Sequence, residues 1–237
     1  MRHRFLACCS QLLCWTPLIL AAPASAPLVA NEQLHYNVNW PSGLSLGEAA
    51  LSAASSANAQ GGGTLHLKFD LDAGIPGFSV LDRYRSDAAG DFCSSELDRT
   101  VAHGRKKTDE KTSFDPHNKT ATRETLGGGR SVMDAGSCSR DALTFLYYVR
   151  HELSEGRMPQ PQRVFLGAPY DIRLEFRGTE TIRVADKPVE ADRFAASAKG
   201  PASSISFDVF FLKDRARTPA LVRVPFAMGT FSMELVK

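Results

Sequence analysis

The 237-residue chain is 43% hydrophobic and 23% charged, the balance of an ordinary globular protein. Removing an N-terminal signal that contains Arg2 and Arg4 leaves 26 of the 28 basic residues against 26 acidic ones, and this neutral balance excludes a nucleic-acid partner. The one basic cluster, residues 105–107, is followed at once by Asp109 and Glu110. This mixed pattern is typical of a solvated strand face, so we assign the cluster no partner.

The N-terminus has the pattern of a secretory signal peptide. Residues 1–4 are basic, residues 5–22 form an apolar run, and Ala22-Pro-Ala24 supplies the small residues for cleavage before Ser25. We expect residues 1–24 to be removed and 25–237 to form a single β-rich domain, periplasmic or secreted, with no integral membrane span. An uncleaved membrane anchor is the alternative, although the run is short for a span and polar residues interrupt it.

Cysteine usage agrees with export. Cys8, Cys9 and Cys14 lie in the signal segment, and only Cys93 and Cys138 remain. In an oxidising compartment this pair predicts a disulfide that closes a loop of about 45 residues and contributes roughly 3–4 kcal/mol. A lipid anchor on Cys8 is not expected, because almost no apolar run precedes that residue.

In the first half of the chain, apolar and polar residues alternate with the period of two that predicts half-buried strands. The predicted strands cover residues 34–40, 44–54, 65–71, 78–86, 91–105, 106–114 and 120–126, of which 91–114 form a polar hairpin. Turns or loops are expected at 41–43, 55–63, 74–77 and 115–118. Gly127–Gly129 lacks the Lys-Ser/Thr ending of a phosphate loop and is expected to open a mobile link toward Cys138.

Residues 141–153 form the one convincing helix. Between positions 142 and 149 only Thr144 is neither apolar nor aromatic, so the helix has no wide polar face and must be buried on most sides. Ser139 or Asp141 can cap its first turn, and Gly156 followed by Pro159 ends it.

Strand patterns resume after the helix. They cover 163–166, 170–177, 181–184, 189–198, 205–211 and 221–226, and a last strand has Phe231, Met233 and Leu235 on one face. The sequence therefore predicts a mainly β protein, with a large antiparallel sheet curved into an open or flattened barrel around one central helix.

Three short motifs also carry a resemblance. They are Tyr36-x-Val38-x-Trp40 with Gly43 and Gly47, then Asp141-x-x-Thr144-x-x-Tyr147-x-x-Arg150 ahead of Gly156, and Gly229-Thr-Phe231-x-Met-x-Leu235. Together they resemble the exported bacterial family catalogued as domain of unknown function 3108, although Thr144 stands where Ser is expected and the cysteine pair is not a family feature. The resemblance implies an exported antiparallel β-structure around a helix and no catalytic residues.

Candidate catalytic groups are few. Gly43-Leu-Ser45-Leu-Gly47 matches a nucleophile elbow, which would make the protein a serine hydrolase, but an elbow needs a parallel sheet and a helix after the serine. The histidines lack metal-ligand spacing, so no metal or cofactor is predicted. Asp70 and Asp72 are expected to lie on the same solvent-facing side of a strand, so no catalytic carboxylate pair is predicted. The histidines concerned are His35, His66, His103, His117 and His151, of which the last three could serve Ser45 as a base.

Within the predicted helix, Arg150 follows a nearly unbroken apolar stretch, one turn after Leu146 and Tyr147, and needs a partner. It either pairs with a carboxylate that holds helix and sheet together, or receives an anionic head group at the mouth of a cavity. The leading hypothesis is a non-enzymatic binding or carrier protein for an apolar or lipid-like ligand, contacted by Arg150, Tyr147, Tyr148 and Phe207. The alternative is an envelope assembly or interaction protein with a packed interior, for which an exposed strand edge would serve.

Overall fold

The computed structural model describes residues 31–57, 63–226 and 229–236. The predicted signal segment 1–24, with its three cysteines, lies outside this part of the chain, as do residues 58–62 of the predicted loop. No helix among the described residues has both the length and the apolar character to cross a bilayer.

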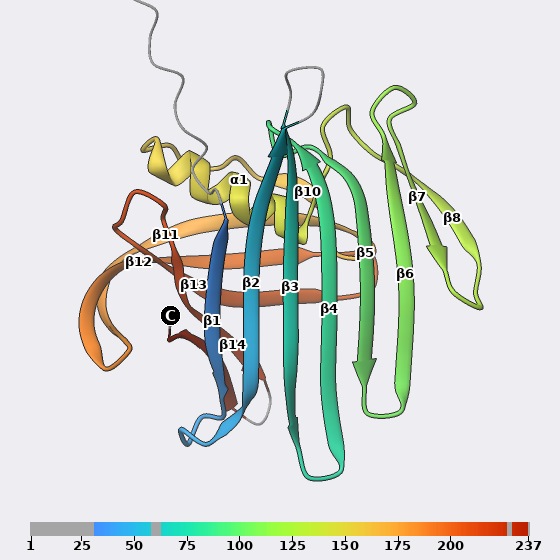
Figure 1. Ribbon diagram of the computed structural model, residues 1–237. Coiled ribbons are helices and arrows are strands. Elements are labelled where there is room, and N and C mark those ends of the chain that lie inside the picture. Colours follow the sequence, from blue (N-terminus) through green and yellow to red (C-terminus); the bar gives the residue numbers. More distant parts are fainter. Residues whose placement is uncertain (1–30, 58–62, 227–228, 237) are drawn as a thin grey trace, which may run out of the picture.

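Within the described ranges, fifteen strands form one sheet, and one helix packs against it (Figure 1). The first eight strands are β1 (Glu32–Asn39), β2 (Ser45–Ala57), β3 (Gly63–Ile75), β4 (Phe78–Ala89), β5 (Ser94–His103), β6 (Lys106–Asp115), β7 (Thr120–Thr125) and β8 (Arg130–Asp134). There follow β9 (Arg140–Asp141), α1 (Ala142–Ser154), β10 (Gln162–Phe165), β11 (Pro169–Val184), β12 (Lys187–Lys199), β13 (Ser204–Leu212), β14 (Pro219–Phe226) and β15 (Gly229–Leu235).

The sheet is antiparallel except at one pair. Its order is β8-β7-β6-β5-β4-β3-β2-β1-β15-β14-β13-β12-β11-β10-β9, so β1 and β15 join the two halves of the chain and β8 and β9 are free edges. The exception is β9 with β10, which run parallel because α1 forms the crossover between them. The predicted open antiparallel sheet with one helix is confirmed.

The two halves of the sheet lie crosswise. In Figure 1, β1–β6 run nearly vertically and β11–β13 run behind them nearly horizontally, with α1 over the upper part of both. The sheet does not close into a barrel, but its halves meet where the backbone N–H of Ser94 donates to the carbonyl of Ser139 at 2.9 Å. The predicted Cys93–Cys138 disulfide is present beside this contact.

Helix α1 is buried as its sequence predicts: no residue from Asp141 to Ser154 is exposed. Asp141 is the cap, and its carboxylate accepts hydrogen bonds from the backbone N–H groups of Leu143 and Thr144. Ser139, the other predicted cap, instead accepts a hydrogen bond from Gly136 N–H. Gly156 follows the helix in the left-handed conformation at φ 72°, which its lack of a Cβ permits.

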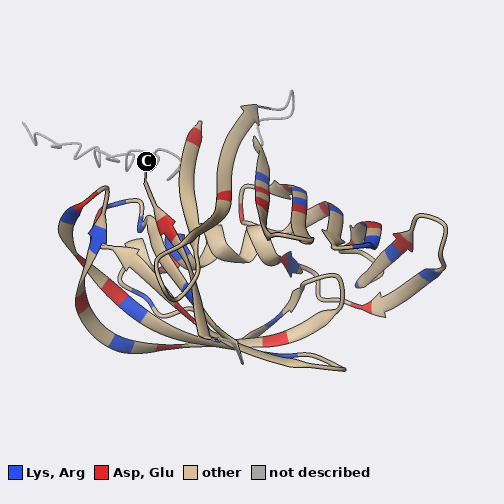
Figure 2. Ribbon diagram, turned by 90° about the horizontal axis from the view of Figure 1, so that it is seen from below, with Lys and Arg blue, Asp and Glu red and all other residues tan. Residues whose placement is uncertain are grey.

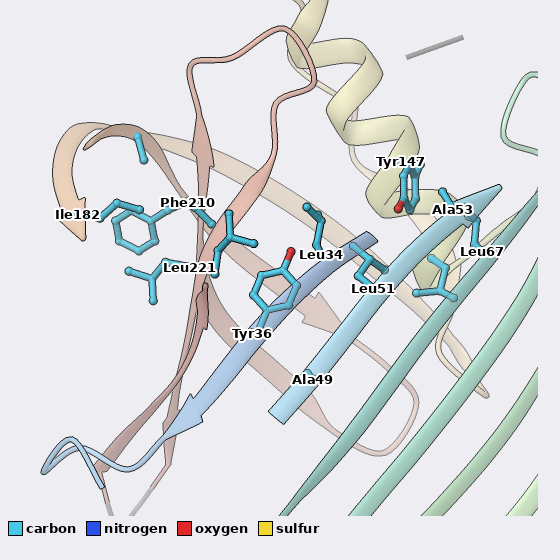
Figure 3. Packing of buried hydrophobic residues seen from close by; sticks show 14 residues of the cluster. Leu34, Tyr36, Ala49, Leu51, Ala53, Leu67, Tyr147, Ile182, Phe210 and Leu221 are labelled. Carbon is cyan, nitrogen blue, oxygen red and sulfur yellow. The ribbon is translucent and has the colours of Figure 1, made fainter. Parts of the chain in front are cut away.

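Two hydrophobic clusters pack on different sides of α1. One joins Leu143 and Tyr147 to strands from both halves of the sheet, and Figure 3 shows it around Tyr36 and Leu51. The other joins Phe145, Val149 and Leu153 to β10–β13; its further buried members are Val164, Ile172, Phe194, Ala198, Val209 and Phe211. Because apolar residues meet sheet on both sides, a helix with no polar face is stable here.

Several boundaries differ from the prediction. Gly127–Gly129 does not open a mobile link but turns the chain into β8. The sequence analysis missed β8 because this strand has only five residues and is polar at both ends. The two-residue strand β9 was also missed. Residues 170–177 and 181–184 belong to one strand, β11, which continues through an irregularity between Phe176 and Gly178.

Candidate functional site

The concave side of the sheet carries a cavity of about 450 Å³ beside α1 that is open to solvent on one side. The helix contributes Ala142, Leu143 and Leu146, and both halves of the sheet line the remainder. The other lining residues are Tyr36, Leu51, Phe69, Asp82, Tyr84, Arg99, Leu166, Tyr170, Ile205, Pro219 and Met233. The lining is mainly apolar, with polar groups gathered on β4 and β5.

The polar side is built around Arg99, whose side chain is 22% exposed. Its Nε donates to the Tyr84 hydroxyl at 3.1 Å, and its Nη1 donates to Glu110 at 2.6 Å. Burial alone would lower the pKa of Arg99, but the nearby Tyr84 and Glu110 oxygens outweigh it and raise the pKa above its ordinary value. Arg99 is therefore a permanent cation at the edge of an apolar cavity.

Neighbouring groups fix this arrangement. Arg123 lies 3.8 Å from the second oxygen of Glu110 and donates to the carbonyl of Gly167 at 2.7 Å. Gly167 leaves room for the ion pair, because a Cβ there would lie 3.0 Å from Arg99 Nη1. One carboxylate is thus shared by two guanidinium groups.

A second polar pair stands nearby. Asp82, which lines the cavity, lies 2.9 Å from His103 Nε2. The polar side of the cavity therefore contains both an arginine and a carboxylate.

The four residues predicted to contact a ligand do not line this cavity. Arg150 and Tyr147 are 0% and 1% exposed and both bind Glu32. Tyr148 lies under Arg140, whose guanidinium carbon is 3.9 Å from the ring centroid. Phe207 lines a separate hollow of about 310 Å³ with residues of β11–β13.

Of the two roles predicted for Arg150, the structure shows the pairing with a carboxylate that holds helix and sheet together. Nη1 and Nη2 donate to the two carboxylate oxygens of Glu32 at 2.7 and 2.6 Å, and Nε donates to the carbonyl of Ala216 at 3.0 Å. Burial alone would lower the pKa of Arg150, but the hydrogen bonds and charge of Glu32 raise it above the ordinary value. Burial also raises the pKa of the Tyr147 hydroxyl, which donates to Glu32 at 2.8 Å.

Ser45 does not stand on a nucleophile elbow. It is exposed at the start of β2, pairs with Asn39 of the antiparallel neighbour β1, and is followed by strand and not by helix. The strained strand-to-helix turn that would activate the hydroxyl is therefore lacking at this position.

Among the described residues, one group of potential metal ligands comes together, namely Asp91 with Cys93 and Cys138. The two sulfur atoms of this group are bonded to each other and are not available as thiolates.

The sequence analysis missed Arg99, Tyr84 and Asp82 because charged strands were taken to face water. Their positions carried a signal: Tyr84 pairs with Phe69 on one side and with Arg99 on the other, so the apolar row of β3 continues into β4 and β5 on one face. Glu32 was missed because the predicted strand began two residues later.

A large open sheet that curves around one helix is the architecture of a β-barrel-like protein. The fold is similar to the crystal structure of a beta-barrel-like protein of domain of unknown function DUF1849 from Brucella abortus, with a TM-score of 0.59 over 90% of this chain and 98% of that chain. Sequence identity is 7%, so the likeness concerns the fold alone.

Residues 34–236 match the family described as "Protein of unknown function (DUF3108)", and the chain belongs to that family. No curated protein shows significant similarity to the chain.

Proposed function

We propose that the protein is an exported, non-enzymatic binding or carrier protein for an amphipathic, lipid-like molecule. The observation that carries the proposal is the cavity of about 450 Å³ between α1 and the sheet. Small-molecule sites are concave, mainly apolar hollows of about 300–1,000 Å³ with a few polar groups that orient the ligand. This cavity has that size and that distribution of groups.

The ligand's apolar part lies against Leu143, Leu146 and Met233 in this proposal, and its polar end lies at Arg99 and Tyr84. Only part of the donor capacity of Arg99 is used by Tyr84 and Glu110. A phosphate, carboxylate or hydroxyl of the ligand can accept from the remaining N–H groups. Burial of the apolar part supplies most of the affinity.

The test is native mass spectrometry and solvent extraction of protein purified from the compartment to which it is exported. We expect a hydrophobic compound to co-purify with the wild type. Leu146→Trp fills the cavity from the helix and should remove the compound. The matched control is Leu126→Trp, because Leu126 is 81% exposed and outside the cavity.

Met233→Trp fills the same cavity from β15 and serves if Leu146→Trp does not fold. Recovery of no compound from the wild type, or of equal amounts from the wild type and both cavity variants, would contradict the carrier proposal.

A second candidate, an interaction protein, is favoured by the free edge of β8. Thr125 with Gly129 and Lys119 with Ala135 are hydrogen-bonded pairs of the β7–β8 hairpin. Because such pairs alternate, the backbone groups of Arg130, Val132 and Asp134 point away from β7 and are open to another strand. If the β8 strands of two copies paired antiparallel with Val132 opposite Val132, Arg130 of each copy would lie opposite Asp134 of the other.

Val132→Pro tests this candidate, since it removes an outward N–H and leaves the β7–β8 hydrogen bonds intact. Sedimentation velocity at increasing concentration should show association of the wild type and none of Val132→Pro. A wild type that stays monomeric, or association that survives Val132→Pro, would contradict self-pairing at this edge.

A further inference from the structure

Four strand ends and turns at one end of the sheet expose large apolar side chains. They lie at the lower end in Figure 1, and Figure 2 views the molecule from that side. We name this set the apolar rim: Leu44 is 65% exposed, Ile75 44%, Phe78 48% and Phe226 59%. Since soluble proteins rarely gather such side chains on adjacent turns, the rim indicates a contact surface.

The rim is structurally supported from behind. The ring centroids of Trp40 and Phe226 lie 4.7 and 5.2 Å from that of Phe231, so aromatic packing ties the ends of β1, β14 and β15 together. The Phe78 ring lies against Gly104 of the β5–β6 turn, where a Cβ would be 3.0 Å away. These contacts hold the turns next to one another and keep the rim side chains at the surface.

The turn segments that carry the rim and the neighbouring β5–β6 turn have charges of one sign. The segments 40–45, 74–79, 103–107 and 226–230 contain no Asp or Glu. They contain three consecutive cations, Arg105, Lys106 and Lys107, to which the sequence pattern alone assigned no partner; we name them the basic turn, and all three are exposed. Of these, Lys107 is paired with Asp109 at 3.0 Å.

The opposite end of the same strands differs. Its turns at 89–93 and 115–119 carry Asp91 and Asp115, and within these two turns no large apolar side chain is exposed. Apolar tips beside cations therefore belong to one end of the sheet and are not a general property of its turns.

We propose that the apolar rim and the basic turn dock the protein on an anionic lipid bilayer. Short apolar side chains on turns can enter the interfacial layer, while adjacent Lys and Arg meet the negative surface potential. A protein partner would need a complementary acidic groove, whereas the bilayer accepts a row of separate tips without a matching shape. The proposal is independent of whether the cavity holds a ligand.

The experiment is flotation of the purified full chain with vesicles of phosphatidylcholine alone or with about one third phosphatidylglycerol. The wild type is expected to bind the anionic vesicles, less so as salt rises, and the neutral vesicles weakly. Phe78→Ser with Phe226→Ser should weaken binding about tenfold or more at any salt concentration. Arg105→Glu with Lys106→Glu should weaken it by at least about tenfold and remove the salt dependence.

Matched controls lie outside the rim. Phe176→Ser changes a phenylalanine that is 53% exposed on β11, and Lys187→Glu with Lys199→Glu reverses two exposed charges on β12. Both controls should bind as the wild type does. Absence of wild-type binding to anionic vesicles, or equal binding by the rim variants and their controls, would overturn the proposal.

The cavity variant Leu146→Trp separates this proposal from the carrier function. Docking by the rim predicts that it binds vesicles like the wild type. Loss of vesicle binding in that variant would mean that the cavity, and not the rim, holds the lipid, and would likewise overturn the proposal.

Discussion

The two ends of α1 both bury a charge, but they compensate it in different ways. At the N-terminal end the Asp141 carboxylate accepts from the hydroxyls of Ser86 and Ser94 at 2.5 and 2.8 Å, and from two backbone N–H groups of the first turn. Near the C-terminal end the Arg150 guanidinium forms a two-point ion pair with Glu32. Each charge has the sign that the nearer end of the helix dipole favours.

The difference also shows what each end attaches. Asp141 joins the helix to β4 and β5, whereas Arg150 joins it to β1 and, through Ala216, to the turn after β13. The N-terminal end depends on neutral donors, none of which carries a charge of its own. The C-terminal end depends on a single opposite charge, so losing one partner there leaves the other buried alone. We therefore expect the C-terminal end to be the more sensitive to substitution.

Glu32→Gln should have the largest effect. Breaking a buried ion pair by removing one partner costs about 3–5 kcal/mol, because the remaining charge stays buried and uncompensated. Denaturant unfolding monitored by circular dichroism measures this change. Glu190→Gln is the control, since the Glu190 side chain is 69% exposed and its neutralisation should change stability by less than about 0.5 kcal/mol.

Removing both charges of the Glu32–Arg150 ion pair should lower the unfolding free energy less than removing one of them. Glu32→Leu combined with Arg150→Met removes both charges, and we expect it to be less destabilising than Glu32→Gln. A Glu32→Gln variant as stable as the Glu190→Gln control would show that the ion pair does not hold this end of the helix.

The disulfide strengthens the N-terminal end, because Cys93 precedes Ser94 and Cys138 precedes Ser139 at the contact between the two halves of the sheet. Its loop of 45 residues predicts a loss of about 3–4 kcal/mol in Cys93→Ser with Cys138→Ser. Adding reductant should destabilise the wild type by a similar amount and leave the double variant unchanged. Reaction of both thiols with a labelling reagent in the folded, unreduced protein would refute the bridge.

Thr144 belongs to the hydrogen-bond network of neutral groups around Asp141, and substituting it should have a smaller effect on stability. Its buried hydroxyl lies 2.7 Å from the Ser94 hydroxyl and accepts from the Asp141 N–H at 2.9 Å. Thr144→Val keeps the shape and removes these two contacts, while the Ser94 hydroxyl still donates to the Asp141 carboxylate and the Asp141 N–H still donates to Ser94 Oγ, so the loss in unfolding free energy should be about 0.5–1.5 kcal/mol. Thr144→Ser keeps the hydroxyl and should cost less; a loss in Thr144→Ser as large as that in Thr144→Val would show that the hydroxyl contributes no more to stability than the methyl group does.

The residues that sequence patterns predicted well are those fixed by local or periodic signals. The helix follows from apolar composition, capping chemistry narrowed its cap to Ser139 or Asp141, and the disulfide follows from cysteine arithmetic. The Asp141 to Arg150 segment was also one of the three motifs on which the family resemblance rested. That Arg150 needs a partner was also evident, since a charge at the end of an apolar stretch within a buried helix cannot remain buried alone.

The partners themselves could not be predicted. Glu32 lies 118 residues from Arg150, and Ser94 lies 47 residues from Asp141, so only the completed sheet brings them together. The cavity has the same origin: Arg99 and Tyr84 belong to strands whose polar residues face inward because the sheet curves around α1. Period-two patterns identify two faces of a strand but do not say which face is inside when both carry polar groups.

The pH dependence of stability distinguishes the two ends most finely, because neutral donors and burial act on Asp141 in opposite directions. Burial raises the pKa of the Asp141 carboxyl, and the hydrogen bonds of Ser86 and Ser94 only partly counter it. Between the unfolded value, about 3.9, and the raised folded value, the folded state keeps a proton that the unfolded state releases. The contribution of Asp141 to unfolding free energy is therefore greatest below about pH 4 and falls as pH rises through that window.

Asp141→Asn cannot titrate, so the stability of the wild type relative to this variant should decline from about pH 4 upward, as measured by denaturant unfolding at each pH. If this difference instead grew with pH, the four hydrogen bonds would outweigh burial, and the N-terminal end would hold a stabilised anion as firmly as Glu32 holds Arg150.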